Sequence, residues 1–145
     1  MVKRADVSPV ANLSIDPEQV CFIIAKAKAF DAMVPPDDPD SGSNPADDRS
    51  IDVLENYGDD PTVQELRGAI AALNMDTRTE LLALCWLGRG DYTAQEWYEA
   101  LKEAQATQDE NLSDYLLGTP LLGDYIEEGY SQLGYSCAEY ELDRL

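Results

Sequence analysis

Apolar residues recur along this chain every three or four positions, the spacing that gathers side chains on one face of an α-helix. The first stripe predicts a helix that begins at Ser14 or Asp16, and Asp16 is an N-cap residue followed by a proline at the first helical position. We expect this helix to end near Met33, because the two prolines at 35 and 36 cannot continue it. The stripe consists of Val20, Ile23, Ile24, Ala27 and Phe30.

A second stripe predicts a helix that starts at Pro61. Asp60 and Pro61 repeat the pairing of an N-cap residue with a proline at the first helical position. A short helix is also expected just before it, over residues 51–57, ended by Gly58. The second stripe consists of Val63, Leu66, Ile70 and Leu73.

The middle of the chain contains the most apolar segment. Residues 81–87 (LLALCWL) are apolar on every side, which is typical of a helix that other helices surround. We therefore place a central helix at about 77–88 and expect Asp76 or Thr77 to open it. Gly88 and Gly90 follow the apolar run and are expected to end this helix.

Further helix starts are predicted in the C-terminal half. Two capping boxes, a Thr or Ser followed by Glu three residues later, occur there, and a Thr-Pro pair lies between them. A short apolar turn or helix over 112–117 precedes the Thr-Pro pair and is closed by Gly118. The expected caps are Thr93 with Glu96, Thr119 with Pro120, and Ser136 with Glu139.

These elements make the chain all-α. No segment shows the alternation of a strand bounded by hairpin turns, and 145 residues is the length of one domain. We predict a compact orthogonal or irregular bundle of six to seven helices around the central apolar helix. Residues 14–145 form this single domain, residues 1–13 a flexible N-terminal tail, and residues 34–50 an acidic, proline-rich linker or loop.

The chain is strongly acidic, with 29 Asp and Glu residues against 10 Lys and Arg and a formal charge of −19. The charge sums to −9 over residues 31–60 and to −11 over 91–145, whereas 61–90 is neutral. Such a chain repels phosphate backbones and anionic lipids, so we expect no direct binding to nucleic acid or membranes. No apolar run approaches the roughly 20 residues of a spanning helix, and the N-terminus lacks the apolar stretch of a secretory signal.

Histidine is absent, which removes Ser–His and Cys–His nucleophiles and His-ligated metal centres. We assign no catalytic residue, metal site or cofactor, since an enzyme here would depend on carboxylates, Tyr, Lys or Arg alone. Cys21, Cys85 and Cys137 are odd in number and widely spaced, with no CxxC motif. We expect three buried free thiols in a reducing cytoplasm rather than a disulfide framework or a zinc site.

Two segments that contain glycine are distinctive together, LCWLGRGDY at 84–92 and YLLGTPLLGDY at 115–125. With VCFII at 20–24 and GYSC at 134–137, they make the chain resemble a bacterial family of uncharacterised proteins, domain of unknown function 3775, over roughly residues 14–142. The resemblance implies a small bacterial cytosolic protein. It implies no activity, cofactor or catalytic residue.

The same two glycine segments are the candidate binding loops. Glycine lets a backbone approach a ligand closely, an arginine among acids suits a carboxylate or phosphate group, and a helix start offers N–H groups to an anion. The structural alternative is that the glycines serve helix ends and close packing and that the arginine pairs with a nearby acid. The candidate residues are Gly88, Arg89, Gly90, Asp91, Tyr92, Gly118, Thr119, Gly123 and Asp124.

Three functions are compatible with these residues. We favour a non-enzymatic helical protein-interaction module, either self-associating or bound to a protein partner. Its basis is the eight tyrosines, five of them from residue 115 on, which exceed what a core needs and suit interfaces. One alternative is an acidic decoy of a basic nucleic-acid-binding protein. The other is a small-ligand binder or enzyme that uses Arg89, Asp91, Tyr92 and Asp124 around one pocket.

Overall fold

The computed structural model of the chain describes residues 11–33, 59–107 and 112–138. These ranges contain six α-helices and one short 3₁₀ helix, and they contain no strand. The prediction of an all-α bundle of six to seven helices is therefore confirmed. The elements are α1 (Pro17–Met33), α3 (Pro61–Ala71), α4 (Met75–Arg89), η1 (Ala94–Glu96), α5 (Trp97–Thr107), α6 (Leu112–Leu117) and α7 (Leu122–Gln132).

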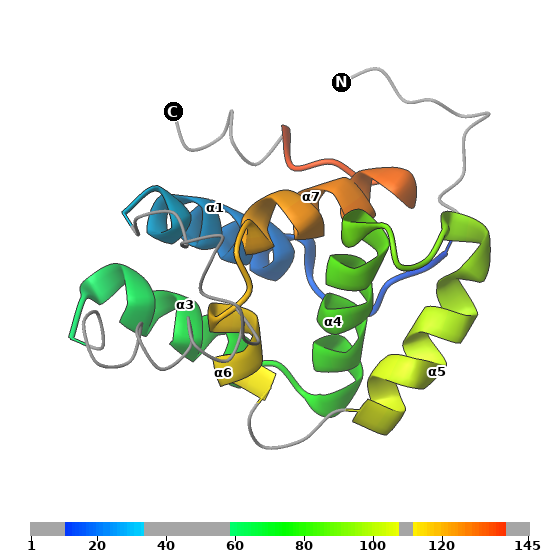
Figure 1. Cartoon of the computed structure of the whole chain (residues 1–145), viewed down its shortest axis with the longest axis horizontal. Coiled ribbons are helices and arrows are strands. Elements are labelled where there is room, and N and C mark those ends of the chain that lie inside the picture. Colours follow the sequence, from blue (N-terminus) through cyan, green and yellow to red (C-terminus); the bar gives the residue numbers. More distant parts are fainter. Residues whose placement is uncertain (1–10, 34–58, 108–111, 139–145) are drawn as a thin grey trace, which may run out of the picture.

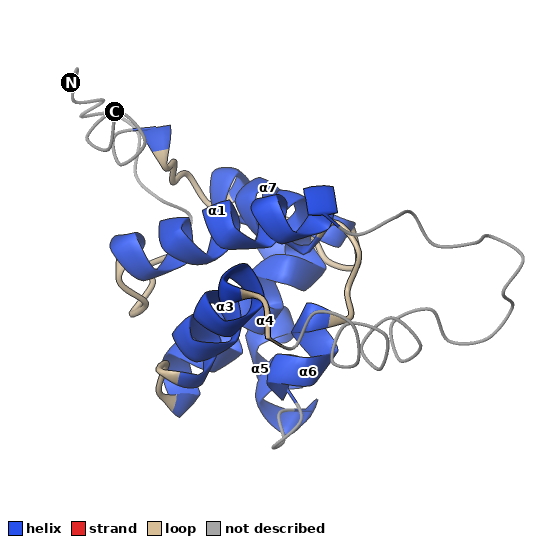
Figure 2. Cartoon of the chain, turned by 90° about the vertical axis from the view of Figure 1, so that its left-hand side faces the viewer, coloured by secondary structure: helices blue, strands red, loops and turns tan. Residues whose placement is uncertain are grey.

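Helix α4 lies at the centre of the bundle (Figure 1). Its residues from Thr79 to Leu87 are all buried, as the apolar run predicts. Helix α5 packs along one side of α4 and α7 crosses another, while α1 contacts both α7 and α3. In the view turned by 90°, α1 and α7 lie side by side, and α3, α5 and α6 lie beneath them (Figure 2).

Local capping explains where several helices begin. Helix α1 begins directly after Asp16, one of the two predicted starts, and ends at Met33 as predicted. The Asp16 carboxylate accepts a hydrogen bond from the Glu18 backbone N–H at 2.9 Å. Asp60 does the same for α3, accepting from the Thr62 N–H at 2.8 Å. The predicted capping box ahead of η1 and α5 is also present. These starts depend on residues close in sequence, which is why the pattern predicts them.

The start of α4 differs from the prediction. We expected Asp76 or Thr77 to open it, but the helix begins at Met75 and Asn74 is the N-cap. The Asn74 side chain accepts a hydrogen bond from the Thr77 N–H at 2.8 Å, and Asp76 lies in the first turn, where its charge suits the helix dipole. Three residues able to cap occur within four positions, and the path of the backbone decides between them.

The start of α7 is the second difference. Thr119 does not cap it, because its hydroxyl donates to the Tyr115 carbonyl at the end of α6, at 2.9 Å. Helix α7 begins only at Leu122, and its N-cap is Leu121 in the left-handed conformation, with φ 61°. The Leu121 N–H donates to the Asp31 carboxylate of α1 at 3.2 Å. The predicted Thr-Pro cap is therefore wrong, and the residue before α7 is instead bonded to a distant helix.

Helices α4 and α7 cross with their backbones in contact. Gly90 ends α4 with φ 98°, as expected, but Gly88 lies inside the helix rather than at its end. A Cβ atom on Gly88 would overlap the Tyr125 carbonyl of α7, and a Cβ on Gly129 would overlap the Leu84 carbonyl of α4. Each helix thus supplies a glycine at the point where the other presents a carbonyl group.

The segment before α1 is fixed against the core. Ala11, which falls within the predicted tail, and Ile15 are both buried. The buried Glu80 carboxylate of α4 accepts the Ser14 N–H at 2.9 and 3.0 Å on its two oxygens, and the Ile15 N–H at 2.8 Å. The Tyr135 hydroxyl donates to the Ala11 carbonyl at 2.8 Å. Hydrogen bonds from two sides therefore hold this extended segment.

The cysteines overturn one expectation. Cys21 of α1 and Cys137 after α7 form a disulfide, with their Cα atoms 5.7 Å apart. Cys85 is free and buried in α4, so the prediction of three free thiols is wrong. The fold brings together two cysteines that lie 116 positions apart, and spacing along the chain carries no information about such a pair.

Several predictions lie outside the described residues. They are the tail up to residue 10, the acidic linker or loop at 34–50, the short helix at 51–57 and the Glu139 half of the last capping box. Among the helices that are described, none is both long and apolar enough to cross a membrane.

Candidate functional site

Arg89, the basic residue of the first candidate loop, is engaged within the fold. Its Nε and Nη2 atoms donate to Asp91 Oδ2 at 2.9 and 2.6 Å, and its Nη1 atom lies 3.4 Å from the Tyr115 hydroxyl. Partial burial by itself lowers the pKa of Arg89, but the hydrogen bonds to Asp91 and Tyr115 outweigh it and raise the pKa above its ordinary value. The guanidinium is therefore charged and already has a carboxylate partner.

The other residues of this loop serve packing and chain direction. The Tyr92 ring stacks on Trp86, with ring centroids 6.1 Å apart. Gly90 supplies the left-handed cap and Gly88 the contact with α7. None of residues 88–92 lines either of the two cavities described below.

The second candidate loop is mostly buried. Gly118 and Thr119 are both buried, between α6 and α7. Gly123 packs against α1, where a Cβ atom would lie 2.7 Å from the Lys28 side chain and 2.9 Å from the Ile24 carbonyl oxygen. Close helix packing therefore accounts for Gly123, and the exposed Asp124 is the one candidate of this loop that faces a cavity.

The two loops lie near each other, but their side chains do not form one site. Gly88 packs against the Tyr125 backbone, and Arg89 reaches Tyr115, so backbone contact joins the two segments. Of the four residues predicted to surround one pocket, Asp124 alone lines a cavity that the structure describes, and it does so without the other three.

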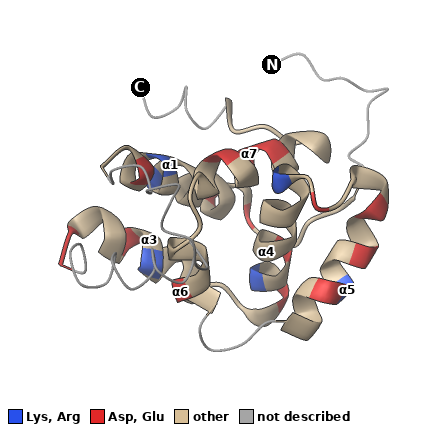
Figure 3. Ribbon diagram, in the orientation of Figure 1, with Lys and Arg blue, Asp and Glu red and all other residues tan. Residues whose placement is uncertain are grey.

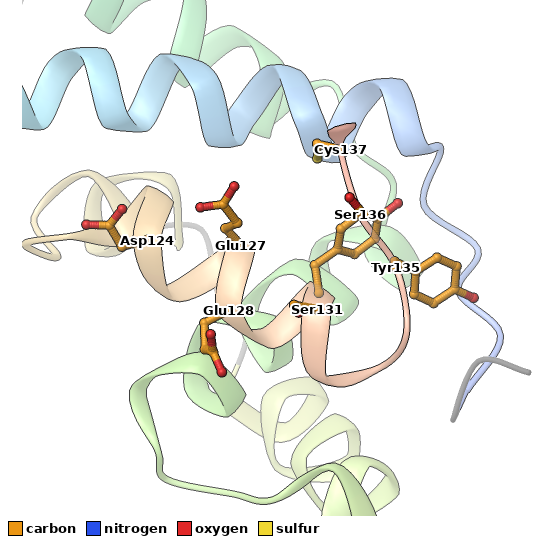
Figure 4. A pocket seen from close by; sticks show the side chains of 8 residues that line it. Asp124, Glu127, Glu128, Ser131, Tyr135, Ser136 and Cys137 are labelled. Carbon is orange, nitrogen blue, oxygen red and sulfur yellow. The ribbon is translucent and has the colours of Figure 1, made fainter. Parts of the chain in front are cut away.

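The larger of the two cavities has a volume of about 470 Å³ and lies along α7 (Figure 4). We call it the α7 cavity. Helix α7 forms one wall, and the segment that follows α7 forms the other. Acidic residues mark α7 in Figure 3, and no Lys or Arg from the described part of the chain lines the cavity. The lining residues are Asp124, Glu127, Glu128, Tyr130, Ser131, Tyr135, Ser136 and Cys137.

One lysine compensates part of the charge of the α7 cavity. Lys28 of α1 lies 2.5 Å from a Glu127 carboxylate oxygen and 3.8 Å from an Asp124 oxygen. Glu128 points away from α1 (Figure 4) and accepts a hydrogen bond from Gln132 at 3.0 Å. The cavity is lined by three carboxylates, and one ammonium group lies beside them. These groups together leave an excess of negative charge.

The wall after α7 is held at three points. The Tyr135 ring stacks on Tyr130, with centroids 4.9 Å apart and planes at 15°. The Tyr135 hydroxyl donates to Ala11 at 2.8 Å, and Cys137 is joined to Cys21 of α1. This wall therefore depends on residues from both ends of the described chain.

The second cavity, of about 360 Å³, lies between α4, α5 and the segment before α1. Tyr98 stands beside it with 71% of its surface exposed. Its buried acid, Glu80, already accepts the backbone N–H groups of Ser14 and Ile15. The lining residues are Ser14, Asp76, Thr79, Glu80, Tyr98, Leu101, Lys102 and Gln105.

Sequence reasoning missed most of the α7 cavity. Glu127 and Glu128 are adjacent, and adjacent residues of a helix point to different sides, so the pair taken by itself indicates a solvated surface. The informative signal is the spacing of three acids, at 124, 127 and 128, which gathers them near one region of the helix. No group of three or more His, Cys, Asp or Glu side chains within the described ranges is arranged to hold a metal ion.

Residues 63–135 match the family described as "Protein of unknown function (DUF3775)". The chain belongs to this family. The matched region runs from α3 to Tyr135, so it contains the α4–α7 crossing and most of the α7 cavity, but neither Cys21 nor Cys137. No curated protein and no solved structure matches the chain. The resemblance seen in the sequence is confirmed over residues 63–135, a shorter range than the predicted 14–142, and DUF3775 membership assigns no activity to any residue.

Proposed function

We propose that the chain is a non-enzymatic helical protein-interaction module whose α7 cavity receives a basic segment of a partner protein. The observation that carries the proposal is a cavity of about 470 Å³, whose described lining residues include three carboxylates and no Lys or Arg. An arginine or lysine side chain entering it would make charge-assisted hydrogen bonds, which are about twice as strong as neutral ones. The hydroxyls of Ser131 and Ser136 offer further acceptors.

The state of the charged groups supports binding more than catalysis. Arg89 is paired with Asp91, and Glu80 accepts backbone N–H groups, so both serve the fold. The Thr79 hydroxyl of the second cavity donates to the Met75 carbonyl at 2.8 Å, so it serves the fold as well. We therefore favour an interaction module over the alternative of an enzyme built on Arg89 and its neighbours.

The overall charge favours a basic partner over a second copy of the chain. A formal charge of −19 attracts basic surfaces and repels other copies of itself. The tyrosines of the C-terminal half are largely used internally, because four of them pack against the core. These four are Tyr115, Tyr125, Tyr130 and Tyr135. An acidic decoy of a basic nucleic-acid-binding protein would use this same attraction between the acidic chain and a basic surface. We further propose that the protein is located in the cytoplasm.

Binding of a short arginine peptide to the full chain tests the proposal. The probe is a fluorescent heptapeptide with two arginines among Gly and Ser residues, and fluorescence anisotropy reports its dissociation constant. The same peptide with citrulline in place of arginine keeps the shape and removes the charge. We expect the arginine peptide to bind and the citrulline peptide to bind at least about tenfold more weakly.

Two double variants with equal charge locate the binding. Asp124→Asn with Glu127→Gln removes two carboxylates from the α7 cavity, whereas Glu99→Gln with Glu103→Gln removes two exposed ones from α5. We expect the α7 variant to bind the peptide at least about fivefold more weakly and the α5 variant to bind like the natural chain. Equal weakening by both variants, or no binding by the natural chain, contradicts the proposal.

A further inference from the structure

We propose that the Cys21–Cys137 disulfide is a redox switch for the α7 cavity, which is complete when the two cysteines are joined and lacks part of its wall when they are reduced. The inference rests on the proposed function only for its binding readout, the affinity of the arginine peptide for the α7 cavity. Its structural part, the release of the wall after α7, is independent of any ligand.

The position of Cys137 ties the disulfide to the cavity. Cys137 lines the α7 cavity, and Figure 4 shows it against α1, where Cys21 lies. Ser136, its neighbour in the wall, accepts a local hydrogen bond from the Ala138 N–H at 3.1 Å. A bond to Ala138 holds Ser136 only to its own segment, whereas the covalent link of the buried Cys137 to α1 ties residues 136–138 across the cavity.

Reduction would leave the rest of the wall in place. Tyr135 stays anchored by its stack on Tyr130 and its hydrogen bond to Ala11, neither of which involves a cysteine. Gly134 also directs the chain, with φ 97°, directly after α7. The release is therefore confined, within the described residues, to Ser136, Cys137 and Ala138, and the helices keep their packing.

The switch needs a dithiol reductant. A thiolate of the reductant attacks one sulfur of the disulfide, and the other cysteine leaves as a thiolate that takes up a proton. The second thiol of the reductant then breaks the mixed disulfide and frees the attacked cysteine. Two electrons and two protons pass to the protein, which gains two thiols, and the reductant becomes a disulfide. In a reducing cytoplasm, the location that we propose, disulfides are typically transient and regulatory.

The third cysteine does not compete for this pair. Cys85 is fully buried in α4, and burial raises the pKa of its thiol to about 12 from an ordinary 9.0, with smaller opposing effects of Arg89 and Asp91. Since the thiolate is the attacking species, Cys85 remains inert at neutral pH. Oxidation of the reduced chain therefore restores the Cys21–Cys137 pair.

Nuclear magnetic resonance and the arginine peptide test the switch together. The samples are the full chain, oxidised and after reduction with dithiothreitol, and the Cys21→Ser, Cys137→Ser double variant. We expect reduction to lower the heteronuclear NOE of residues 136–138 while the amide shifts of α4 stay unchanged. The peptide should bind about tenfold more weakly to the reduced chain, because the released residues must be ordered again on binding.

The variants separate a switch from a structural crosslink. The double serine variant should bind the peptide as weakly as the reduced chain, with or without dithiothreitol. The Cys85→Ala variant should lose affinity on reduction to the same extent as the natural chain. Two results would overturn the switch. One is a change in the amide chemical shifts of α4 on reduction, and the other is an unchanged heteronuclear NOE at residues 136–138. If the peptide binds neither redox state, the proposed function fails, and the NOE alone decides whether reduction releases the wall.

Discussion

The crossing of α4 and α7 makes the substitution Gly129→Ala a demanding test of the fold. Gly129 lies on the Leu84 carbonyl, and the added methyl group would sit 3.0 Å from the Leu84 carbonyl carbon, 3.2 Å from its Cα and closer still to its oxygen. The obstacle is helix backbone, which no change of rotamer moves. The two helices must therefore separate by about 1 Å to restore ordinary contact.

The expected loss of stability follows from two opposing effects. Overpacking a well-packed core costs about 1–3 kcal/mol, and a backbone obstacle places this case at the upper end. The higher helix propensity of alanine raises the free energy of unfolding by about 1 kcal/mol when it replaces a glycine inside a helix. We expect Gly129→Ala to lower the free energy of unfolding by about 2 kcal/mol and the Tm by about 8 °C.

A matched substitution in α3 isolates the contact. Gly68 is exposed inside α3, and a Cβ atom there would meet nothing within 4 Å. Gly68→Ala should therefore raise the free energy of unfolding by about 1 kcal/mol. Urea unfolding followed by the fluorescence of Trp86 and Trp97, with circular dichroism as a second probe, measures both variants.

The difference between the two alanine variants decides the argument. If Gly129→Ala lies within about 0.5 kcal/mol of Gly68→Ala, the helices do not meet backbone to backbone and the described crossing is refuted. Gly88→Ala repeats the test from the other helix, because its Cβ would overlap the Tyr125 carbonyl. It should destabilise the chain at least as strongly as Gly129→Ala does.

Three further predictions concern buried or strained groups. Glu80→Gln should lower the free energy of unfolding by about 1–3 kcal/mol, because an amide oxygen replaces only part of the acceptor that binds the Ser14 and Ile15 N–H groups; urea unfolding equal to that of the natural chain would contradict this. The pKa of Cys85, raised to about 12, keeps the folded thiol protonated. Stability should therefore fall as pH rises from 9 towards 12, where the unfolded thiol alone ionises, and iodoacetamide at pH 8 should modify Cys85 only in urea. Leu121→Gly should raise the Tm by relieving about 1 kcal/mol of left-handed strain, and a lower Tm would show that the Leu121 side chain contributes more than its backbone costs.

Local patterns predicted the helices whose boundaries are decided locally. The apolar stripe of α1 and the Asp-Pro pair ahead of α3 each fix an element with residues a few positions apart. The all-apolar run of α4 likewise predicted its central place, since only a surrounded helix can bury every side. Periodicity and capping are short-range effects, and the sequence displays them directly.

Long-range contacts decided the features that were missed. At the start of α7, Asp31 accepts the Leu121 N–H from 90 positions away. The partners of Glu80 lie 65 and 66 positions away, and Cys137 lies 116 positions from Cys21. The α7 cavity belongs to the same class, because one wall is a helix and the other is held in place by the N-terminal part of the chain. Such distances leave no periodic mark in a sequence.

The link between Cys21 and Cys137 also turns most of the chain into a closed covalent ring. A protease that cuts once anywhere between these two residues would yield two peptides that stay bound together as one molecule. Under non-reducing denaturing conditions the cut chain would migrate as a single species, and a reductant would separate it into two bands. Damage to the oxidised protein inside the ring would therefore not by itself release a fragment.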